Sequence, residues 1–179
     1  MSSLTILGDT SGSVVLQAPA VAGSSTLTLP TTGGTVLATT TPGAVLQVAN
    51  ANYTTSNSTT STSYVTAVTG SITVKSATSN VVINAVFGWN TANANSLIKY
   101  DRTVGGSTTN LYTSASWVLR NNNAGLVDML PYVLYVDTHG QAVGTIITYT
   151  ISVNRGSGSG TIITNENFTA RITMTEVAV

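Results

Sequence analysis

The feature that most constrains this chain is a run without any charged side chain, from Thr10 to Val74, between Asp9 and Lys75. Charged residues make up only 7% of the 179 residues, against roughly 25% in typical globular proteins. A free domain normally surrounds its core with charge, and a neutral surface gives little repulsion between copies. The run therefore predicts a chain that associates with copies of itself or with a larger assembly.

The composition indicates an all-β fold. Thr occurs 33 times and Ser 20 times, while hydrophobic residues reach 42%, so the sequence lacks the low hydrophobicity of a disordered chain. Val, Ile, Thr and Tyr, which suit a pleated and half-buried surface, dominate the sequence. With no cysteine, the chain has neither a disulfide framework nor a thiolate metal site.

Two regions are expected, an N-terminal β-arm over residues 1–42 and a head domain over residues 43–179. The arm reads as short strands separated by turn residues, in SLTIL, SVVLQA, STLTLP and GTVLAT. About 40 residues rarely fold without partners, so we expect the arm to become ordered against other chains. Its anchoring side chains are predicted to be Val14, Leu16, Leu27, Leu29, Val36 and Leu37.

The head domain contains eight strand-like segments joined by Gly, Asn and Ser turns, which predicts a β-sandwich or jelly roll. The segment RGSGSGT at 155–161 is expected to form a mobile hairpin tip, and NNNAG at 121–125 an exposed loop. The expected strands are AVLQVANA, YVTAVTGSITV, NVVINAVFGWN, SLIKYDRTV, TNLYTSASWVLR, PYVLYVD, GTIITYTISVN and FTARITMTEV.

The arm resembles a segment common in virion proteins of tailed bacteriophages. The residues that carry the resemblance are G-x-V-x-L-x-A-P-A-V-A-G at Gly12–Gly23, T-L-T-L-P at Thr26–Pro30 and G-T-V-L at Gly34–Leu37. The rest of the chain is similar to the trimeric jelly-roll heads of the tumour-necrosis-factor type. The resemblance implies an extended arm followed by a homotrimeric jelly roll. It also implies a place in the virion, with assembly in the host cytoplasm.

Within that resemblance, the single arm copy and the lack of a long shaft favour a capsid decoration or cement protein. Its partners would be two further copies and the major capsid protein or other virion proteins. The alternative is the tip of a tail fibre or head fibre that binds host-surface glycans. In that case the contacts are expected at exposed head loops, around Asn121, Asn122, Asn123 and His139.

Other functions have little support in the sequence. Six basic and six acidic residues give no net charge, which argues against nucleic acid, and no apolar run approaches the roughly 18 residues of a membrane span. A catalytic interpretation would pair His139, the only histidine, with Asp137 and a nearby Ser or Thr, but no motif marks a nucleophile. We therefore expect no enzyme activity, no metal and no cofactor.

Two sets of side chains remain open to more than one interpretation. One interpretation places Asp101 and Arg102 in an ion pair at a subunit interface. Because adjacent strand residues point to opposite faces, we expect instead that each has its own partner. The aromatic residues are expected in the sandwich core and the trimer seam, with a sugar-binding surface as the alternative. They are Phe87, Trp89, Tyr100, Tyr112, Trp117, Tyr132, Tyr135, Tyr149 and Phe168.

Overall fold

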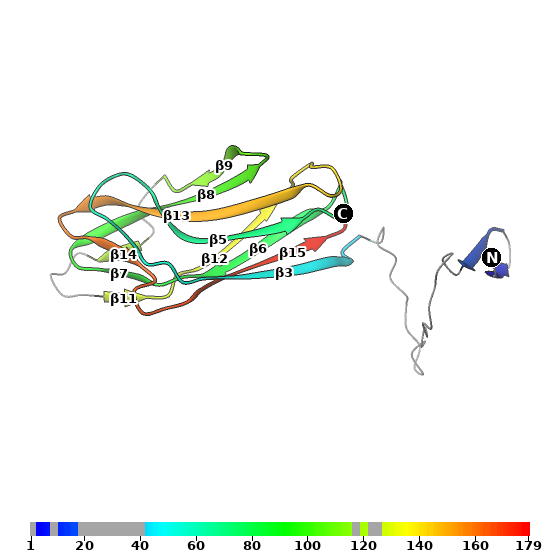
Figure 1. Ribbon diagram of the computed structural model, residues 1–179, viewed down its shortest axis with the longest axis horizontal. Helices are drawn as coiled ribbons and strands as arrows, with labels where there is room; N and C mark the ends of the chain where they lie inside the picture. The colour runs from blue at the N-terminus through cyan, green and yellow to red at the C-terminus, as the bar shows by residue number, and fades with distance from the viewer. Residues whose placement is uncertain (1–2, 8–10, 18–41, 116–118, 122–126) are drawn as a thin grey trace. The chain divides into compact units, whose positions relative to one another are not determined.

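The computed structural model describes residues 3–7, 11–17, 42–115, 119–121 and 127–179, all of them in strands, turns or loops. The chain divides into two compact units, Met1–Val36 and Leu37–Val179 (Figure 1). In the first unit, β1 (Ser3–Leu7) pairs with β2 (Ser13–Gln17) in an antiparallel hairpin. Both strands coincide with strands expected in the arm. In the described residues, no helix is long and apolar enough to cross a bilayer.

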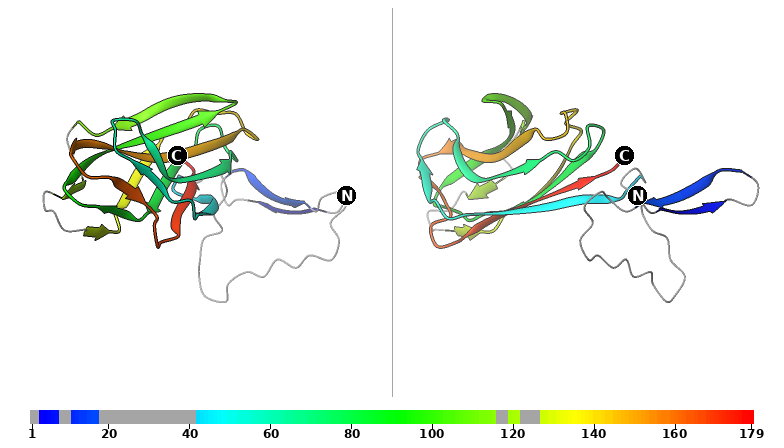
Figure 2. Two further views of the ribbon diagram at one scale, coloured as in Figure 1. Left: turned by 60° about the vertical axis from the view of Figure 1, so that its left-hand side comes forward. Right: turned by 45° about the vertical axis from the view of Figure 1, so that its right-hand side comes forward.

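The second unit is a β-sandwich of two main antiparallel sheets (Figures 1 and 2). One sheet has the order β12-β6-β15-β3, formed by Tyr132–Asp137, Asn80–Val86, Ala170–Val177 and Val45–Tyr53. The other has the order β9-β8-β13-β5, formed by Ser107–Thr113, Ala94–Val104, Ile146–Gly158 and Val65–Thr73. The expected jelly roll is confirmed, because successive strands alternate between the sheets except at the β8–β9 hairpin.

A third, short sheet continues the sandwich at the end away from the C-terminus (Figure 1). Its order is β11-β7-β14-β4, formed by Val127–Met129, Trp89–Thr91, Ile162–Thr164 and Asn57–Thr59. Strands β4, β11 and β14 are not predicted by the sequence, because strands this short show no clear alternation. The remaining strand, β10 (Leu119–Asn121), pairs with β8.

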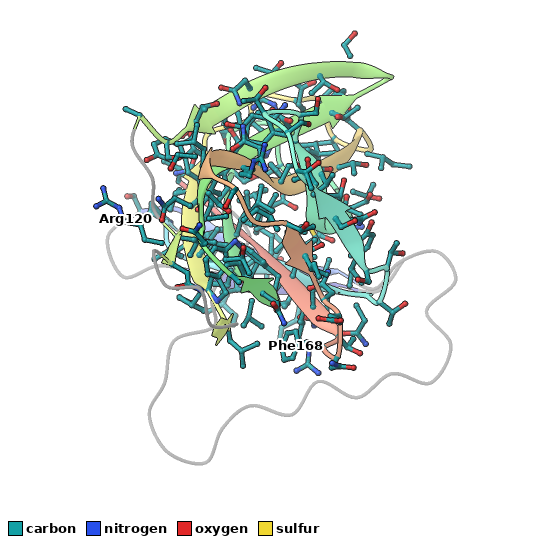
Figure 3. All side chains as sticks on the ribbon, turned by 90° about the vertical axis from the view of Figure 1, so that its left-hand side faces the viewer. Arg120 and Phe168 are labelled. Atoms are coloured by element: carbon teal, nitrogen blue, oxygen red, sulfur yellow. The ribbon has the colours of Figure 1, made fainter. Side chains whose placement is uncertain are left out.

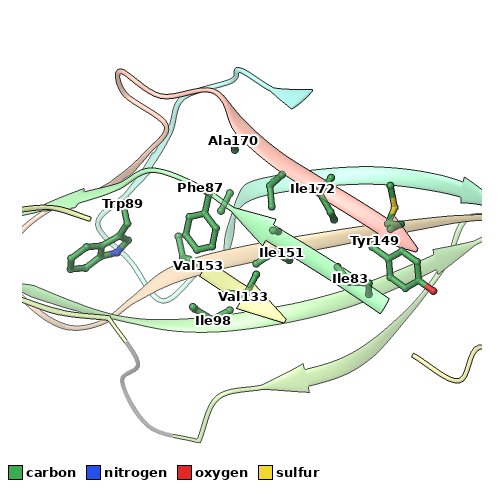
Figure 4. Packing of buried hydrophobic residues seen from close by; sticks show 14 of the residues in the cluster. Ile83, Phe87, Trp89, Ile98, Val133, Tyr149, Ile151, Val153, Ala170 and Ile172 are labelled. Atoms are coloured by element: carbon green, nitrogen blue, oxygen red, sulfur yellow. The ribbon is translucent and has the colours of Figure 1, made fainter. Parts of the chain in front are cut away.

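Alternation of side chains along the strands produces the core. In β6, Val81, Ile83 and Ala85 point inward and are buried. Ile172 and Met174 of β15 do the same, and Figure 4 shows several of these side chains meeting between the sheets. The sheets approach so closely at Gly70 that an added Cβ would lie 2.6 Å from Cγ2 of Ile172. The fully buried large side chains include Trp89, Tyr149 and Phe87.

The expected hairpin tip at 155–161 is shorter than the sequence suggested. Strand β13 continues to Gly158, because Arg155, Ser157 and Gly158 pair with the start of β8. Glycine and serine near a strand end do not prevent pairing when a neighbouring strand supplies hydrogen-bonding partners. Only the residues after Gly158 form the turn.

Candidate interaction surface

The outward side chains of the β12-β6-β15-β3 sheet form a surface that we call the apolar sheet face. On edge strand β12, Tyr132, Leu134 and Val136 are 68%, 59% and 51% exposed. On the opposite edge strand β3, Val45 and Val48 are 60% and 54% exposed. Large apolar side chains exposed singly are ordinary, but these lie on one sheet and face one side.

Strand register aligns these side chains in rows across the sheet. Val136 lies opposite Val82, which lies opposite Thr175, which lies opposite Val48. This row therefore crosses all four strands without a charge.

The four strands contain three charged residues, of which Asp137 and Glu176 are buried and Arg171 alone is exposed. Polar side chains also occur on this face, where Thr173 donates to Asn50 at 2.7 Å.

The outward side chains of the β9-β8-β13-β5 sheet form a different surface, the hydroxyl face. Here hydroxyls pair across strands, with oxygens 3.0 Å apart for Thr69 and Thr150 and 2.8 Å apart for Ser71 and Thr148. Thr103 and Thr108 pair in the same way at 2.8 Å. Because hydroxyls also bond water well, this face is stable in solvent without a partner.

The contrast between the two faces locates the surface that gains by being covered. Each Å² of apolar surface removed from water contributes roughly 25 cal/mol, so covering the apolar sheet face is favourable. Covering the hydroxyl face would remove water from hydroxyl groups that already have partners, so the gain in free energy is much smaller than for the apolar sheet face. The exposed edge of β12 adds unpaired backbone groups beside the apolar side chains.

A groove of about 330 Å³ borders the apolar sheet face at β12. Tyr100 and Tyr135 stack inside the sandwich edge with ring centres 5.5 Å apart, and Tyr112 lies 5.4 Å from Tyr100. Tyr112 is 44% exposed. The described lining residues are all uncharged: Ile98, Tyr100, Tyr112, Leu119, Pro131, Tyr132, Val133 and Leu134.

The aromatic residues thus divide between core and surface. Phe87, Trp89 and Tyr149 are core residues, as expected. Four tyrosines lie near β12: Tyr100 and Tyr135 are half-buried, and Tyr112 and Tyr132 are exposed. Their expected place in a trimer seam stays a prediction. Trp117 lies outside the described residues.

The hairpin of the first unit also exposes apolar side chains. Leu4, Ile6, Leu7 and Val15 are each more than half exposed. Of the predicted anchor residues, Val14 and Leu16 lie in β2, opposite Ile6 and Leu4. The other four, Leu27, Leu29, Val36 and Leu37, lie outside the described residues.

The head-loop residues expected at an exposed site are placed differently. His139 and Asn121 are 3% and 4% exposed, so the expected exposure is wrong for both. Asn121 belongs to β10, and its side-chain amide donates to the carbonyl of Thr91 at 2.8 Å. Asn122 and Asn123 lie outside the described residues.

A buried polar network surrounds His139 and brings it to a serine, as a catalytic pair requires. Its Nε2 lies 3.1 Å from Oγ of Ser79, and Nδ1 accepts the backbone N–H of Gln141 at 2.9 Å. Since Nδ1 is an acceptor, the neutral ring carries its proton on Nε2 and donates to Ser79. Burial lowers the pKa of His139 below its ordinary value, which Asp137 and Glu176 partly offset.

This geometry differs from that of a hydrolase. Oγ of Ser79 lies 2.6 Å from a carboxylate oxygen of Glu176 and 2.7 Å from the carbonyl oxygen of Ser76, so its hydroxyl donates to these acceptors and not to the imidazole. Ser79 is fully buried, so its oxygen cannot reach a substrate carbonyl. A serine nucleophile needs an acceptor nitrogen on His and a carboxylate behind the other nitrogen, and neither condition holds.

Glu176 is a fully buried carboxylate held by several donors. The backbone N–H groups of Lys75 and Ser76 donate to it at 2.9 and 2.8 Å, and the Gln47 amide donates as well. Burial by itself raises the pKa of Glu176. The hydrogen bonds from Ser79, Gln47, Ser76 and Lys75 together outweigh it, so the pKa lies below its ordinary value.

The expected separate partners of Asp101 and Arg102 are confirmed. Lys99 pairs with Asp101 at 2.6 Å, and Arg102 pairs with Asp137 at 2.9 Å. Arg102 lies on β8 and Asp137 on β12, so the second pair joins the two sheets. The Tyr149 hydroxyl donates to Asp137 at 2.8 Å; burial, then this hydrogen bond, raise the pKa of the phenol far above its ordinary value.

Comparisons with known proteins give distant likenesses. No family model and no curated protein matches the chain. Structures of infectious bursal disease virus, Gt and Gx strains, match with 14% and 18% identity and TM-scores of 0.36. Each match covers 97% of this chain, but only 46% of the Gt-strain protein chain and 45% of the Gx-strain protein chain. The chain therefore spans less than half the length of these proteins, and the strand order, not this likeness, establishes its fold.

Proposed function

We propose that the protein is a structural component of a virus particle, assembled from copies of itself through the apolar sheet face. The observation that carries the proposal is the difference between the two outer faces of one sandwich. One face is satisfied by hydroxyl pairs, whereas the other carries an uncharged row of three valines and one threonine from edge to edge. Such a face favours a partner of equally low charge, and another copy of this chain supplies one.

Three copies per assembly is the number that the resemblance of the head to trimeric jelly rolls supports. A closed ring buries the same surface on each copy and leaves no repeating face open, which stops growth into fibres. The absence of net charge favours this association, because copies do not repel one another.

Attachment to the particle is assigned to the arm. A two-stranded hairpin is marginally stable alone, and the described hairpin exposes apolar side chains that need cover. Its sequence resembles segments of tailed-phage virion proteins, which supports contact with a capsid protein or another virion protein. Decoration or cementing of the capsid then works by mass action: binding across subunit boundaries stabilises the assembled shell.

The proposed role is structural and not enzymatic. The serine beside His139 is buried, and its hydroxyl donates a hydrogen bond to Glu176, which supports this assignment. The location that follows is the virion, with assembly in the host cytoplasm.

Two measurements test the proposal. The purified chain should have three times the mass of 18.3 kDa in light scattering, and purified particles should carry it in many copies. Leu4→Asp with Ile6→Asp should keep the trimer mass and reduce particle binding, since charge on the hairpin opposes burial. A monomer at micromolar concentration, or unchanged particle binding by this variant, would contradict the corresponding part of the proposal.

A further inference from the structure

A second candidate site lies at the end of the sandwich opposite the C-terminus. The chain enters the head beside its C-terminus, where Gly43 donates to the carbonyl of Ala178 at 2.8 Å. Strand β15 runs from there to Ala170 at the other end, a distance of about 25 Å for eight residues. A pocket of about 360 Å³ opens at that other end, and we call it the distal pocket.

Residues from three separate segments line the distal pocket. Figure 3 looks at this end of the head and labels Phe168, which lies far from Arg120 in that view. Trp89 forms part of the wall and is itself buried, with its indole N–H donating to Ser96 at 2.8 Å. The described lining residues are Gly88, Trp89, Asn90, Leu130, Glu166, Asn167 and Phe168.

Asn165 holds two walls of the distal pocket together. Its backbone lies in the left-handed region at φ 57°, and its side chain is 3% exposed. The side-chain oxygen accepts the N–H of Gly88 at 2.9 Å, and the side-chain amide donates to the carbonyl of Ala67 at 2.6 Å. The backbone N–H of Asn165 donates to the carbonyl of Gly88 at 3.1 Å.

The wall at Gly88 depends on the absence of a side chain. A Cβ there would lie 3.1 Å from the nitrogen of Asn165 and 3.2 Å from Cβ of Phe168. These contacts, with the bonds of Asn165, fix the turn that carries Glu166, Asn167 and Phe168. A strained backbone held by satisfied hydrogen bonds is the arrangement found at preformed ligand sites.

The chemistry of the rim selects a class of ligand. Phe168 is half-buried and Leu130 is 59% exposed, so the pocket offers apolar surface. Beside it, the amide of Asn90 donates to the carboxylate of Glu166 at 3.1 Å, and Asn167 is exposed. Amides and a carboxylate supply donors and acceptors for hydroxyl groups, while an aromatic ring packs against C–H faces.

Other ligand classes fit this rim less well. The described lining contains the Glu166 carboxylate and no cation, which disfavours phosphate and other anions. A lipid chain would leave the amides and the carboxylate without partners, at a cost for each buried group. Among the described residues, no group of three His, Cys, Asp or Glu side chains could hold a metal ion.

We infer that the distal pocket binds a neutral saccharide of one or two hexose units. The pocket volume falls within the range of small-ligand sites, about 300–1,000 Å³. This inference goes beyond the proposed function and does not need the copies to form a trimer.

Saturation-transfer NMR on the full chain tests the inference, with maltose, cellobiose, lactose and diacetylchitobiose as probes. At least one probe should bind with a dissociation constant below about 20 mM. Phe168→Ala should weaken that binding about tenfold, since the ring packs on the sugar face. Glu166→Gln, which keeps the shape of the side chain, should weaken it about threefold through loss of a charged acceptor.

Tyr64→Ala serves as the matched control, because it removes a half-buried aromatic ring that lines neither the distal pocket nor the groove at β12, and it should leave binding unchanged. Thermal unfolding and the trimer mass of all three variants should match the parent chain. The inference is overturned if no probe binds at about 20 mM. It is also overturned if binding survives unchanged in both pocket variants. Neither outcome alters the oligomer mass, so failure here is distinguishable from failure of the proposed function.

Discussion

The two outer faces of this sandwich are built from similar β-branched residues but have opposite properties. On the hydroxyl face, Thr69, Ser71 and their partners on β13 satisfy one another across strands. On the apolar sheet face, Val82 and Val136 occupy the equivalent outward positions and have no polar groups to satisfy. Valine and threonine are nearly the same size. The hydroxyl group of threonine in place of a methyl group of valine therefore makes one face suited to solvent and the other suited to burial against a partner.

The sharpest way to break this comparison is to place a charge on each face. Leu134→Arg should raise the dissociation constant of the assembly about 100-fold or more, because the cation would be buried without a partner. Thr148→Arg on the hydroxyl face should change it about twofold or less, since that face stays in water. Sedimentation of both variants measures the difference, and equal effects would mean that the faces are equivalent in assembly.

The interior between the faces offers a second test, with two ion pairs as a matched set. Arg102→Ala leaves the Asp137 carboxylate buried without its cation, with the Tyr149 hydroxyl still donating to it, and should lower the free energy of unfolding by about 3 kcal/mol. Lys99→Ala should cost about 1 kcal/mol, because Lys99 is partly exposed and the Asn110 amide still donates to the buried Asp101 carboxylate. Urea unfolding gives both values, and a smaller loss for Arg102→Ala would refute its role as a link.

Lowering the pH should reduce the stability of the fold without changing the dissociation constant of the assembly. The pKa of His139 is lowered in the folded state, so its contribution is complete above the unfolded pKa of about 6.5 and is lost as pH falls. Glu176 also has a lowered pKa, and its contribution is lost at still lower pH. Protonation of Nδ1 in His139 would also break its bond from Gln141.

Thermal unfolding between pH 7.5 and 5 should therefore show falling stability. His139→Gln should flatten this dependence over that range. The strands that carry the apolar sheet face place no histidine or carboxylate on it, so the dissociation constant should stay level while the protein remains folded. A pH-dependent dissociation constant in the folded range would contradict that account of the face.

The smallest expected effect concerns a hydroxyl pair. Ser71→Ala removes the partner of Thr148 on the hydroxyl face and should lower the free energy of unfolding by about 0.5 kcal/mol or less, since water replaces the lost bond. Urea unfolding measures it. A loss above about 2 kcal/mol would show that the hydroxyl face is not satisfied by solvent.

Much of the fold was predictable because periodicity of two is a local property. The alternation in β6 and β15 identifies both strands and their inward residues without any structure. Strand β12 shows the limit, since Tyr132 to Val136 are apolar at every position. Local pattern cannot decide which side of such a strand faces the core.

The candidate sites were less predictable, because each joins distant segments. His139 was singled out as the only histidine, but its partner Ser79 lies 60 residues away among many other serines. Gly88 and Asn165, which frame the distal pocket, lie 77 residues apart. The one sequence signal for the distal pocket was Phe168. It is one of the aromatic residues expected in the core or trimer seam, for which a sugar-binding surface was the alternative interpretation.

The sequence alone determined that this chain forms β structure and carries almost no charge, since these follow from residue types and their alternation, and it predicts association with partners. Tertiary structure decided which face is apolar, which residues frame the distal pocket and why His139 is buried. The physical reason is that sheet pairing sets neighbours across strands by register, and register depends on the packing of the whole sandwich.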